Sequence, residues 1–204
     1  MTPVERVRAA RLRRRLLAAA LGLPLLAWRE ASGQTLRATP ACAESADSAQ
    51  ATPPQTAGPY YMPDSPRRAS LVEAGEPAPR LVLGGRVLTT RCRPVAGALL
   101  DVWHCDAAGH YDHSGYRYRG HLLADASGDY RLETIVPGLY PGRTRHIHVR
   151  VRAPRGPLLT TQLYFPGEPG NAGDGLWQRA LEIALAADAA GQTRVGRFDF
   201  VLVG

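Results

Sequence analysis

The fold is decided by a stretch near the middle of the chain, which reads HIHVRVR from His146 to Arg152. Ile147, Val149 and Val151 alternate with polar residues, which is the pattern of a β-strand with one apolar face. Similar short runs, separated by turn residues, lie on both sides of it: Leu81 to Thr89, Ala98 to His104, Asp129 to Ile135, Leu158 to Phe165 and Arg194 to Val203. Strands so close together in sequence indicate a sandwich or barrel rather than alternating strands and helices.

One stretch between these runs has a different period. From Gly175 to Ala187, apolar residues that include Leu176, Ile183 and Leu185 stand at helical spacing, which predicts a single helix. We therefore expect residues 80–204 to form an all-β, antiparallel β-sandwich with one late helix. A chain of 204 residues can bury one core of this size, so a second domain is not expected.

The segment before the first strand has the composition of an extended arm. Residues 34–58 are rich in Ala, Thr, Ser, Pro and Gln and show no period, and they end at Gly58-Pro59-Tyr60-Tyr61. Such a composition favours irregular structure over a core element. We assign residues 34–79 to an extended N-terminal arm.

Residues 1–33 have the organisation of an export signal. Six arginines precede an apolar run from Leu16 to Trp28, and this run is shorter than the roughly 20 apolar residues that a spanning helix needs. A cleaved signal therefore fits better than a stable membrane anchor. Because Arg14 and Arg15 stand directly before the run, it resembles a twin-arginine signal, with an ordinary secretory signal as the alternative. We expect an exported, periplasmic protein.

The net charge argues against a nucleic-acid partner. Removal of residues 1–33 takes away seven arginines and two glutamates, so the formal charge of +7 falls to +2. The remaining chain has no stripe of arginines interleaved with aromatic residues, which nucleic-acid binders show. That class of function is excluded.

Three cysteines, Cys42, Cys92 and Cys105, leave one unpaired if a disulfide forms, and their spacing matches no zinc framework. In an oxidising compartment a bridge from Cys42 to Cys92 is our hypothesis, although the sequence does not fix the connectivity.

The HIH motif can bind a metal ion. Alternation along a strand places His146 and His148 on one face, with their α-carbons roughly 6.5 to 7 Å apart, so both imidazoles can reach one ion. The alternative is two polar residues on a solvent-facing strand. Two tyrosines stand in turn-rich segments nearby, Tyr111 after the strand with Trp103 and Tyr140 in a loop of prolines and glycines. Either one could also be an ordinary packed aromatic residue.

These residues resemble a known family, the intradiol ring-cleavage dioxygenases, and in particular the catalytic subunits of protocatechuate dioxygenases. In that family a tryptophan stands eight positions before the first iron-binding tyrosine, as Trp103 stands before Tyr111. The second ligand tyrosine lies in a P-G-x-Y-P turn, matched by Pro137 to Pro141. An arginine precedes the H-I-H pair by three positions, as Arg143 does.

Further matches extend the resemblance over residues 53–203. Residues 161–165 (TQLYF) and 197–202 (RFDFVL) resemble two strands of the family, and Gly58-Pro59-Tyr60 resembles an arm that reaches the pocket. Any one motif is weak evidence, but the ordered agreement of five is specific.

The resemblance implies a non-heme Fe(III) centre and an enzyme that opens a catechol-type ring with O2 to give a muconate-type diacid. The implied iron ligands are Tyr111, Tyr140, His146 and His148. Anionic phenolate oxygens suit a hard ferric ion better than thiolates do. The family needs no flavin, nicotinamide or heme.

The resemblance also implies roles for individual residues. Tyr140 is the ligand that leaves and accepts a substrate proton, and Arg143 stabilises negative charge on the substrate, with an exposed loop arginine as its alternative. Gln162 orients the substrate or oxygen, and Trp103 forms part of the pocket wall. Tyr60 reaches the pocket from its own arm or from that of a partner subunit, or else it pins the arm to the core.

The sequence departs from the family in two places. The interval from Tyr111 to Tyr140 is shorter than in the protocatechuate enzymes, and no helical segment stands where the catechol and hydroxyquinol enzymes have a dimerisation domain. The substrate therefore stays open among catechol, protocatechuate, a hydroxyquinol or a larger exported aromatic, and so does assembly into a homo-oligomer. The alternative functions are a non-catalytic metal- or ligand-binding β-sandwich carrier, which would hold copper or zinc, and a surface adhesion module.

Overall fold

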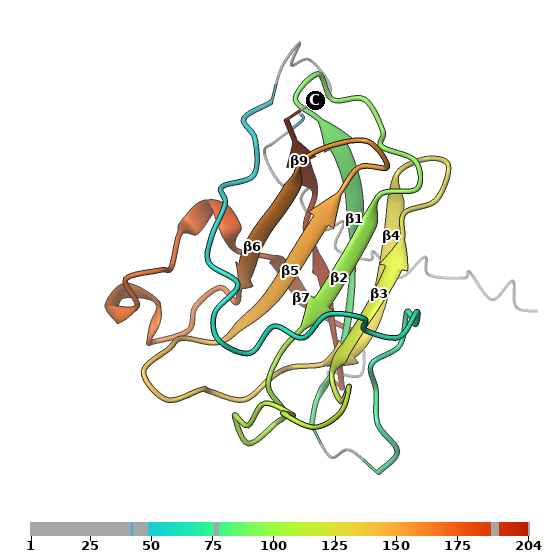
Figure 1. Ribbon diagram of the computed structural model, residues 1–204. Helices are drawn as coiled ribbons and strands as arrows, with labels where there is room; N and C mark the ends of the chain where they lie inside the picture. Colours follow the sequence, from blue (N-terminus) through green and yellow to red (C-terminus); the bar gives the residue numbers. More distant parts are fainter. Residues whose placement is uncertain (1–41, 43–48, 76–77, 189–191, 204) are drawn as a thin grey trace, which may run out of the picture. The chain divides into compact units, whose positions relative to one another are not determined.

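The computed structural model describes residues 42, 49–75, 78–188 and 192–203. These residues form an all-β sandwich, as predicted (Figure 1). The strands are β1 (Arg80–Thr89), β2 (Leu99–Trp103), β3 (Arg119–Leu123), β4 (Asp129–Ile135), β5 (His146–Arg152), β6 (Leu158–Tyr164), β7 (Ala184–Ala187), β8 (Thr193–Arg197) and β9 (Phe200–Leu202). Residues 1–33, where we expect the export signal, lie outside the described residues, as do 34–41 and 43–48 of the arm.

The strands build two sheets. The first has the order β3-β2-β5-β6 and is antiparallel throughout. The second has the order β4-β1-β8-β7, and β9 pairs with the end of β1. In this second sheet β1 pairs antiparallel with β4 but parallel with β8 and β9. The sandwich is therefore mostly antiparallel, with β1 as the strand that carries both kinds of pairing.

The core lies between the inner faces of the two sheets. Ile147, Val149 and Val151 of β5 are at most 1% exposed and pack in one cluster with Leu81 and Leu83 of β1. This is the alternation that the sequence predicts. Since neighbouring residues of a strand point to opposite faces, the two histidines of β5 lie on the outer face of the first sheet.

The predicted late helix from Gly175 to Ala187 is wrong. That stretch contains the short 3-10 helix η3 (Arg179–Leu181) followed by strand β7, and a second 3-10 helix, η2 (Asn171–Gly173), precedes it. Leu181 and Ile183, two positions apart, are both buried. The apolar residues of this stretch are therefore compatible with the alternation of a strand as well as with the spacing of a helix. Pairing of β7 with β8 satisfies the backbone that a helix would have satisfied internally.

Two strand predictions also change in detail. The run from Arg194 to Val203 is divided into β8 and β9, because the strand ladder is interrupted at Asp199, whose side chain accepts the hydrogen bond of the Arg86 backbone N–H. Strand β3 was not predicted, although it covers the free edge of β2.

The arm crosses the outer face of the first sheet. Hydrogen bonds tie Gln55 to Thr160 of β6, and Arg68 to His121 of β3. Farther along, Leu71 of the arm donates to Glu133 of β4. Figure 1 shows this segment passing in front of the first sheet, in cyan to green. The arm thereby covers the histidines of β5: Gly58 lies against His148, and both histidines are buried although they stand on the outer face.

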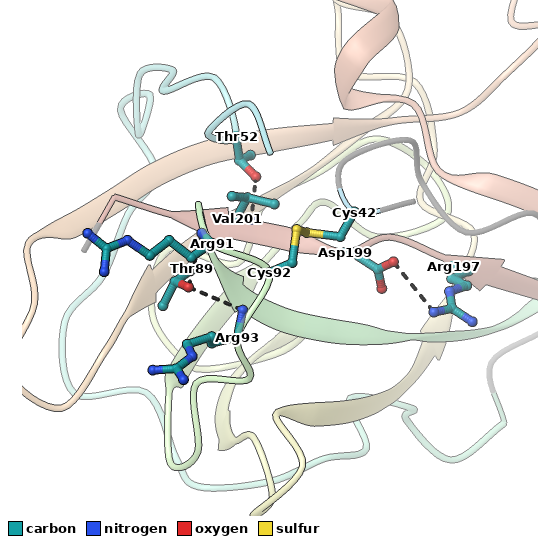
Figure 2. The surroundings of a disulfide bond; sticks show 9 residues. All are labelled: Cys42, Thr52, Thr89, Arg91, Cys92, Arg93, Arg197, Asp199 and Val201. Atoms are coloured by element: carbon teal, nitrogen blue, oxygen red, sulfur yellow. Dashed lines mark hydrogen bonds and ion pairs between the residues drawn. A yellow bond between two sulfur atoms is a disulfide. The ribbon is translucent and has the colours of Figure 1, made fainter. Parts of the chain in front are cut away.

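A disulfide joins Cys42 to Cys92, as hypothesised, and Cys105 is free and buried. Figure 2 shows the bridge beside the hydrogen bond that Val201 N–H donates to the Thr52 hydroxyl, at 2.8 Å. The bridge thus fastens the start of the arm to the end of β1. None of the helices in the described part of the chain has the length and apolar character needed to cross a membrane.

Candidate metal centre and active site

The site begins with the two histidines of β5. His146 and His148 are each 3% exposed, and their Nε2 atoms lie 3.2 Å apart. Nδ1 of His146 donates a hydrogen bond to the carbonyl of Thr144 at 2.7 Å, so its Nε2 is the acceptor nitrogen of the ring and carries a lone pair. Two ring nitrogens therefore converge on one point under the arm.

Both histidines are held in their neutral form. Burial lowers the pKa of His146 to about 4 and lowers the pKa of His148 well below its ordinary value. Neutral imidazole is the form that binds metal ions. The pair is thus ready to act as ligands at neutral pH.

Trp103 fixes the orientation of His148. It is paired with His148 across β2 and β5, and the two rings stack with centroids 4.9 Å apart and planes 4° apart. Trp103 is 1% exposed. The indole thereby shields one face of the His148 ring from solvent.

Tyr111 lies beside the histidines. Its hydroxyl is 3.3 Å from His146 Nε2, and the side chain is buried. Burial raises the pKa of the Tyr111 phenol well above its ordinary value. A phenolate at this position therefore requires a strong cation nearby.

Tyr140 and Tyr60 complete the aromatic cluster. The ring of Tyr140 meets that of Tyr111 edge-on at 5.7 Å, and its hydroxyl shares a 2.6 Å hydrogen bond with that of Tyr60. Tyr60 comes from the chain's own arm and stacks on Tyr111 with centroids 4.5 Å apart. The three phenols lie together, and both Tyr60 and Tyr140 are partly exposed.

The loops that carry Tyr111 and Tyr140 are locked together by close backbone approach. Gly138 N–H donates to the carbonyl of Asp106 at 2.8 Å. A Cβ on Gly109, which has φ +87°, would lie 2.2 Å from the carbonyl oxygen of Leu139. Only glycine allows this contact and this backbone conformation. The separation of the two phenols is therefore set by the backbone.

Arg143 and Gln162 lie on the other side of the histidines. Gln162 is fully buried and is paired with His148 across β5 and β6. Its Oε1 accepts a hydrogen bond from Arg143 at 2.7 Å. Arg143 also forms an ion pair with Asp174, at 2.9 Å. The residues that the sequence selects for iron and substrate thus come together from four segments of the chain.

The sequence reasoning missed two residues of this site. Tyr164 donates its hydroxyl to Gln55 at 2.7 Å and lies 3.4 Å from Arg143. It stands two positions after Gln162 on the same strand face, so alternation could have identified it. Asp174 lies in a loop without a pattern, and nothing in the sequence indicates that it holds Arg143.

Of the other histidines, His113 meets the ring of Tyr60 edge-on at 5.1 Å. His104 is buried and bonded to the carbonyl of Cys105 and to the Thr134 hydroxyl, while the side chain of His110 is 80% exposed. In the part of the chain that the structure covers, no group of three or more His, Cys, Asp or Glu residues could hold a metal ion. The oxygen atom in contact with His146 Nε2 is instead the Tyr111 hydroxyl, at 3.3 Å.

The comparison with known proteins agrees with this chemistry. A family model described as "Dioxygenase" matches residues 56–204. Protocatechuate 3,4-dioxygenase beta chain of Burkholderia cepacia is 38% identical over 132 residues, which cover 55% of this chain and 56% of that one. Chlorocatechol 1,2-dioxygenase of Pseudomonas sp. (strain P51) is 31% identical over 176 residues, 73% of this chain and 69% of that one. The chain belongs to the intradiol ring-cleavage dioxygenase family.

A solved structure of a dioxygenase domain is also similar to this chain. The dioxygenase domain of a dioxygenase carbohydrate-binding protein fusion from Streptomyces sp. SirexAA-E is 52% identical, with a TM-score of 0.72 over 76% of this chain and 99% of that one. Against longer members of the intradiol family the match is partial. The chain spans 56% of the Burkholderia protein and 58% of catechol 1,2-dioxygenase from Candida albicans.

Intradiol dioxygenases use non-heme iron, and the donor set of this chain fits that metal. Two neutral imidazole nitrogens converge beside the buried phenol oxygen of Tyr111. Hard oxygen ligands suit a ferric ion, whereas structural zinc prefers four nitrogen or sulfur ligands. His146 Nε2 faces the Tyr111 hydroxyl at 3.3 Å and His148 Nε2 at 3.2 Å, and a cation between these atoms would replace their mutual contacts.

Proposed function

We propose that this chain is a non-heme, Fe(III)-dependent intradiol dioxygenase. Its substrates would be a small aromatic diol of the catechol type and O2, and its product a muconate-type diacid. The observation that carries the proposal is the convergence of two neutral imidazoles with the buried Tyr111 phenol, beside the Arg143–Gln162 pair.

Tyr111, Tyr140, His146 and His148 would hold the iron. When bound, a ferric ion supplies a Lewis-acidic centre that takes the two oxygens of a catechol and makes the ring reactive towards O2. The chain supplies ligands of unequal burial for this purpose. Tyr111 is buried, whereas Tyr140 is partly exposed and hydrogen-bonded to Tyr60.

Because Tyr140 is less buried than Tyr111, it suits the role of the ligand that would leave the metal and accept a proton. Its hydroxyl already has a partner outside the histidine pair, at 2.6 Å in Tyr60. That bond would hold the protonated Tyr140 while a substrate hydroxyl gives up its proton. Tyr60 would in addition line the substrate side of the pocket.

Arg143 and Gln162 would act on the substrate. The Arg143 guanidinium is oriented by Asp174 and Gln162 before substrate arrives. A fixed positive charge of this kind stabilises negative charge that develops on a substrate oxygen, and it does so best where water is excluded. Gln162 would orient the substrate or oxygen, and Trp103 would exclude water behind His148.

We further propose that the protein is exported, to the periplasm by the twin-arginine route, without a stable membrane anchor. The arginine-rich segment and the short apolar run of residues 1–33 support this. The disulfide between Cys42 and Cys92 adds support, since disulfides persist in oxidising compartments. Assembly into a homo-oligomer is compatible with the proposal, and size-exclusion chromatography of the mature chain decides it.

Turnover of a diol panel tests the proposed activity. The mature chain is loaded with Fe(III), and O2 uptake is measured with catechol, protocatechuate and hydroxyquinol. We expect a muconate-type diacid that carries both atoms of isotopically labelled O2. An extradiol product, a label in one atom only, or no uptake with any diol would overturn the proposal and favour the non-catalytic carrier.

A matched pair of variants assigns the activity to the site. Arg143→Met should lower kcat about 100- to 1000-fold, the cost of removing one charge-stabilising group. Arg131→Met is the control, because the Arg131 side chain is 64% exposed and pairs only with Glu133 among described ion pairs. Equal activity of the two variants would contradict the role of Arg143.

A further inference from the structure

Arg119 is a buried charge that forms no direct ion pair with any of the described carboxylates. It begins β3 and is 2% exposed, which makes it one of the largest fully buried side chains. Buried charges are ordinarily paired with an opposite charge. Among the described residues, however, no carboxylate lies within ion-pair distance of Arg119. A charge retained under these conditions calls for an explanation.

The guanidinium binds two backbone carbonyls instead. One terminal nitrogen donates to the carbonyl of Tyr60 at 2.6 Å, and the other donates to that of Asp112 at 2.8 Å. Tyr60 belongs to the arm, and Asp112 follows Tyr111 directly in the chain. Arg119 therefore connects the arm to the loop that carries Tyr111.

This connection coincides with the tightest aromatic contact of the site. The rings of Tyr60 and Tyr111 stack at 4.5 Å with planes 17° apart, and the Tyr60 hydroxyl reaches that of Tyr140 at 2.6 Å. Since the backbone of Tyr60 and the backbone next to Tyr111 share one rigid guanidinium, the two stacked rings are held in register with each other.

The local backbone is shaped to bring Arg119 inside. Tyr118, the residue before it, has φ +52°, a left-handed conformation that is uncommon for a bulky residue. At Gly120, the residue after it, an added Cβ would lie 2.8 Å from the Arg68 side chain and 2.7 Å from that of Leu71. The arm is thus pressed against β3 next to the buried arginine, and a strained position such as that of Tyr118 persists where the surrounding structure over-determines it.

We propose that Arg119 is a positioning residue, which clamps Tyr60 of the arm against Tyr111 and thereby fixes two of the three phenols at the centre. The inference rests on the proposed function for its catalytic consequence, but the clamp itself does not depend on iron. Arginine suits this task because its planar fork donates in two fixed directions, whereas a lysine ammonium acts as a point charge.

The test compares Arg119→Lys with Arg68→Lys in the mature chain. Arg68 is the matched control, because it donates to the carbonyls of Arg119 and Tyr116 in the same region but contacts neither Tyr60 nor Asp112 among the described interactions. Arg119→Gln is made as well. Its side chain carries no charge, so its burial needs no counter-ion, and it can reach only one of the two carbonyls.

Three readouts separate positioning from a general structural role. Near-ultraviolet circular dichroism of the iron-free protein reports the packing of the stacked tyrosines. The visible band of the iron-loaded protein reports the phenol ligands, and kinetics give kcat and KM. For the Arg119 variants we expect a weaker aromatic signal, a shifted visible band and kcat/KM reduced about 10- to 100-fold, a cost typical of small misplacement. The Arg68 variant should match wild type in all three.

The outcomes are distinct. Unchanged aromatic and visible signals in Arg119→Lys and Arg119→Gln would overturn the clamp, as would identical changes in Arg68→Lys. Failure of both Arg119 variants to fold would make the residue a determinant of the fold and would also overturn it. If wild type binds no iron, the proposed function fails, while the iron-free aromatic signal still decides the clamp.

Discussion

Replacing Asp174 by Asn removes the charge that holds Arg143 in place and leaves the shape of the side chain almost unchanged. The Asp174 side chain is 3% exposed. Its Oδ2 accepts hydrogen bonds from Arg143 Nε and from the backbone N–H of Thr144, both at 2.9 Å, and its Oδ1 accepts one from Leu176 N–H at 2.9 Å. An amide has one oxygen for these three donors, so at least one of them loses its acceptor.

The expected cost follows from the burial of the pair. Loss of one partner from a fully buried ion pair costs about 3 to 5 kcal/mol. Because the Arg143 side chain is 19% exposed and can be partly hydrated, we expect about 2 to 3 kcal/mol for Asp174→Asn. For a chain of this size that corresponds to a fall in Tm of about 4 to 12 °C. The freed guanidinium should also lower kcat by about 10- to 100-fold.

Urea unfolding of the mature chain at neutral pH measures the stability change. Glu133→Gln serves as the control, because the side chains of the Arg131–Glu133 pair are 64% and 48% exposed, and such surface pairs contribute about 0 to 1 kcal/mol. Equal losses in the two variants, or a loss below about 1 kcal/mol for Asp174→Asn, would refute the reasoning from burial.

The effect should depend on pH with a defined sign. Burial raises the pKa of Asp174, but hydrogen bonds from Leu176, Thr144 and Arg143 outweigh it and hold the pKa below the ordinary value of 3.8. A carboxyl with a depressed folded pKa stabilises the fold above its unfolded pKa, and this contribution is lost as the pH falls through the folded pKa. The difference between wild type and Asp174→Asn should therefore be constant near neutral pH and shrink below pH 3.8.

Three further predictions concern other parts of the molecule. Reduction of the Cys42–Cys92 bridge, whose partners are 50 residues apart, should lower the free energy of unfolding by about 4 kcal/mol; urea curves with and without reductant check this, and identical curves would contradict it. Gly109→Ala should cost more than about 3 kcal/mol, because the methyl group would lie 2.2 Å from a carbonyl oxygen of the facing loop; a variant as stable as wild type in the same assay would refute the close approach. Burial lowers the pKa of His104 and of His146 from 6.5 to about 4, so iron-free protein should lose stability as the pH falls from 6.5 towards 4, by about 1.4 kcal/mol per pH unit for each histidine; equal unfolding free energies at pH 7 and pH 5 would contradict this.

Much of the fold could be predicted because its strands carry a simple period. Asp129–Ile135 was predicted to the residue, and β5 and β6 to within one residue. The same alternation predicted that His146 and His148 lie on one face of a strand. Their proximity could therefore be predicted from the sequence more directly than that of any other pair of site residues. The Cys42–Cys92 bridge was also predicted correctly.

The remainder depends on contacts that a sequence pattern does not encode. The late helix was wrong because a short apolar stretch around Leu181 and Ile183 fits both periods, and the partner strand β8 decides between them. Asp174 and Arg119 carry no local signal, since their roles arise only when a loop or the arm folds onto the sheet. The export signal stays a prediction, as do the roles of the four tyrosine and histidine ligands.

The measurement that tests the central claim most directly is an anaerobic visible spectrum of the purified, Fe(III)-loaded mature chain, followed by catechol and then O2. We predict a coloured protein with a tyrosinate-to-iron band, which shifts when catechol is added and decays as O2 is consumed. A protein that stays colourless after ferric reconstitution, or a band that catechol leaves unchanged, would contradict an iron centre held by Tyr111, Tyr140, His146 and His148.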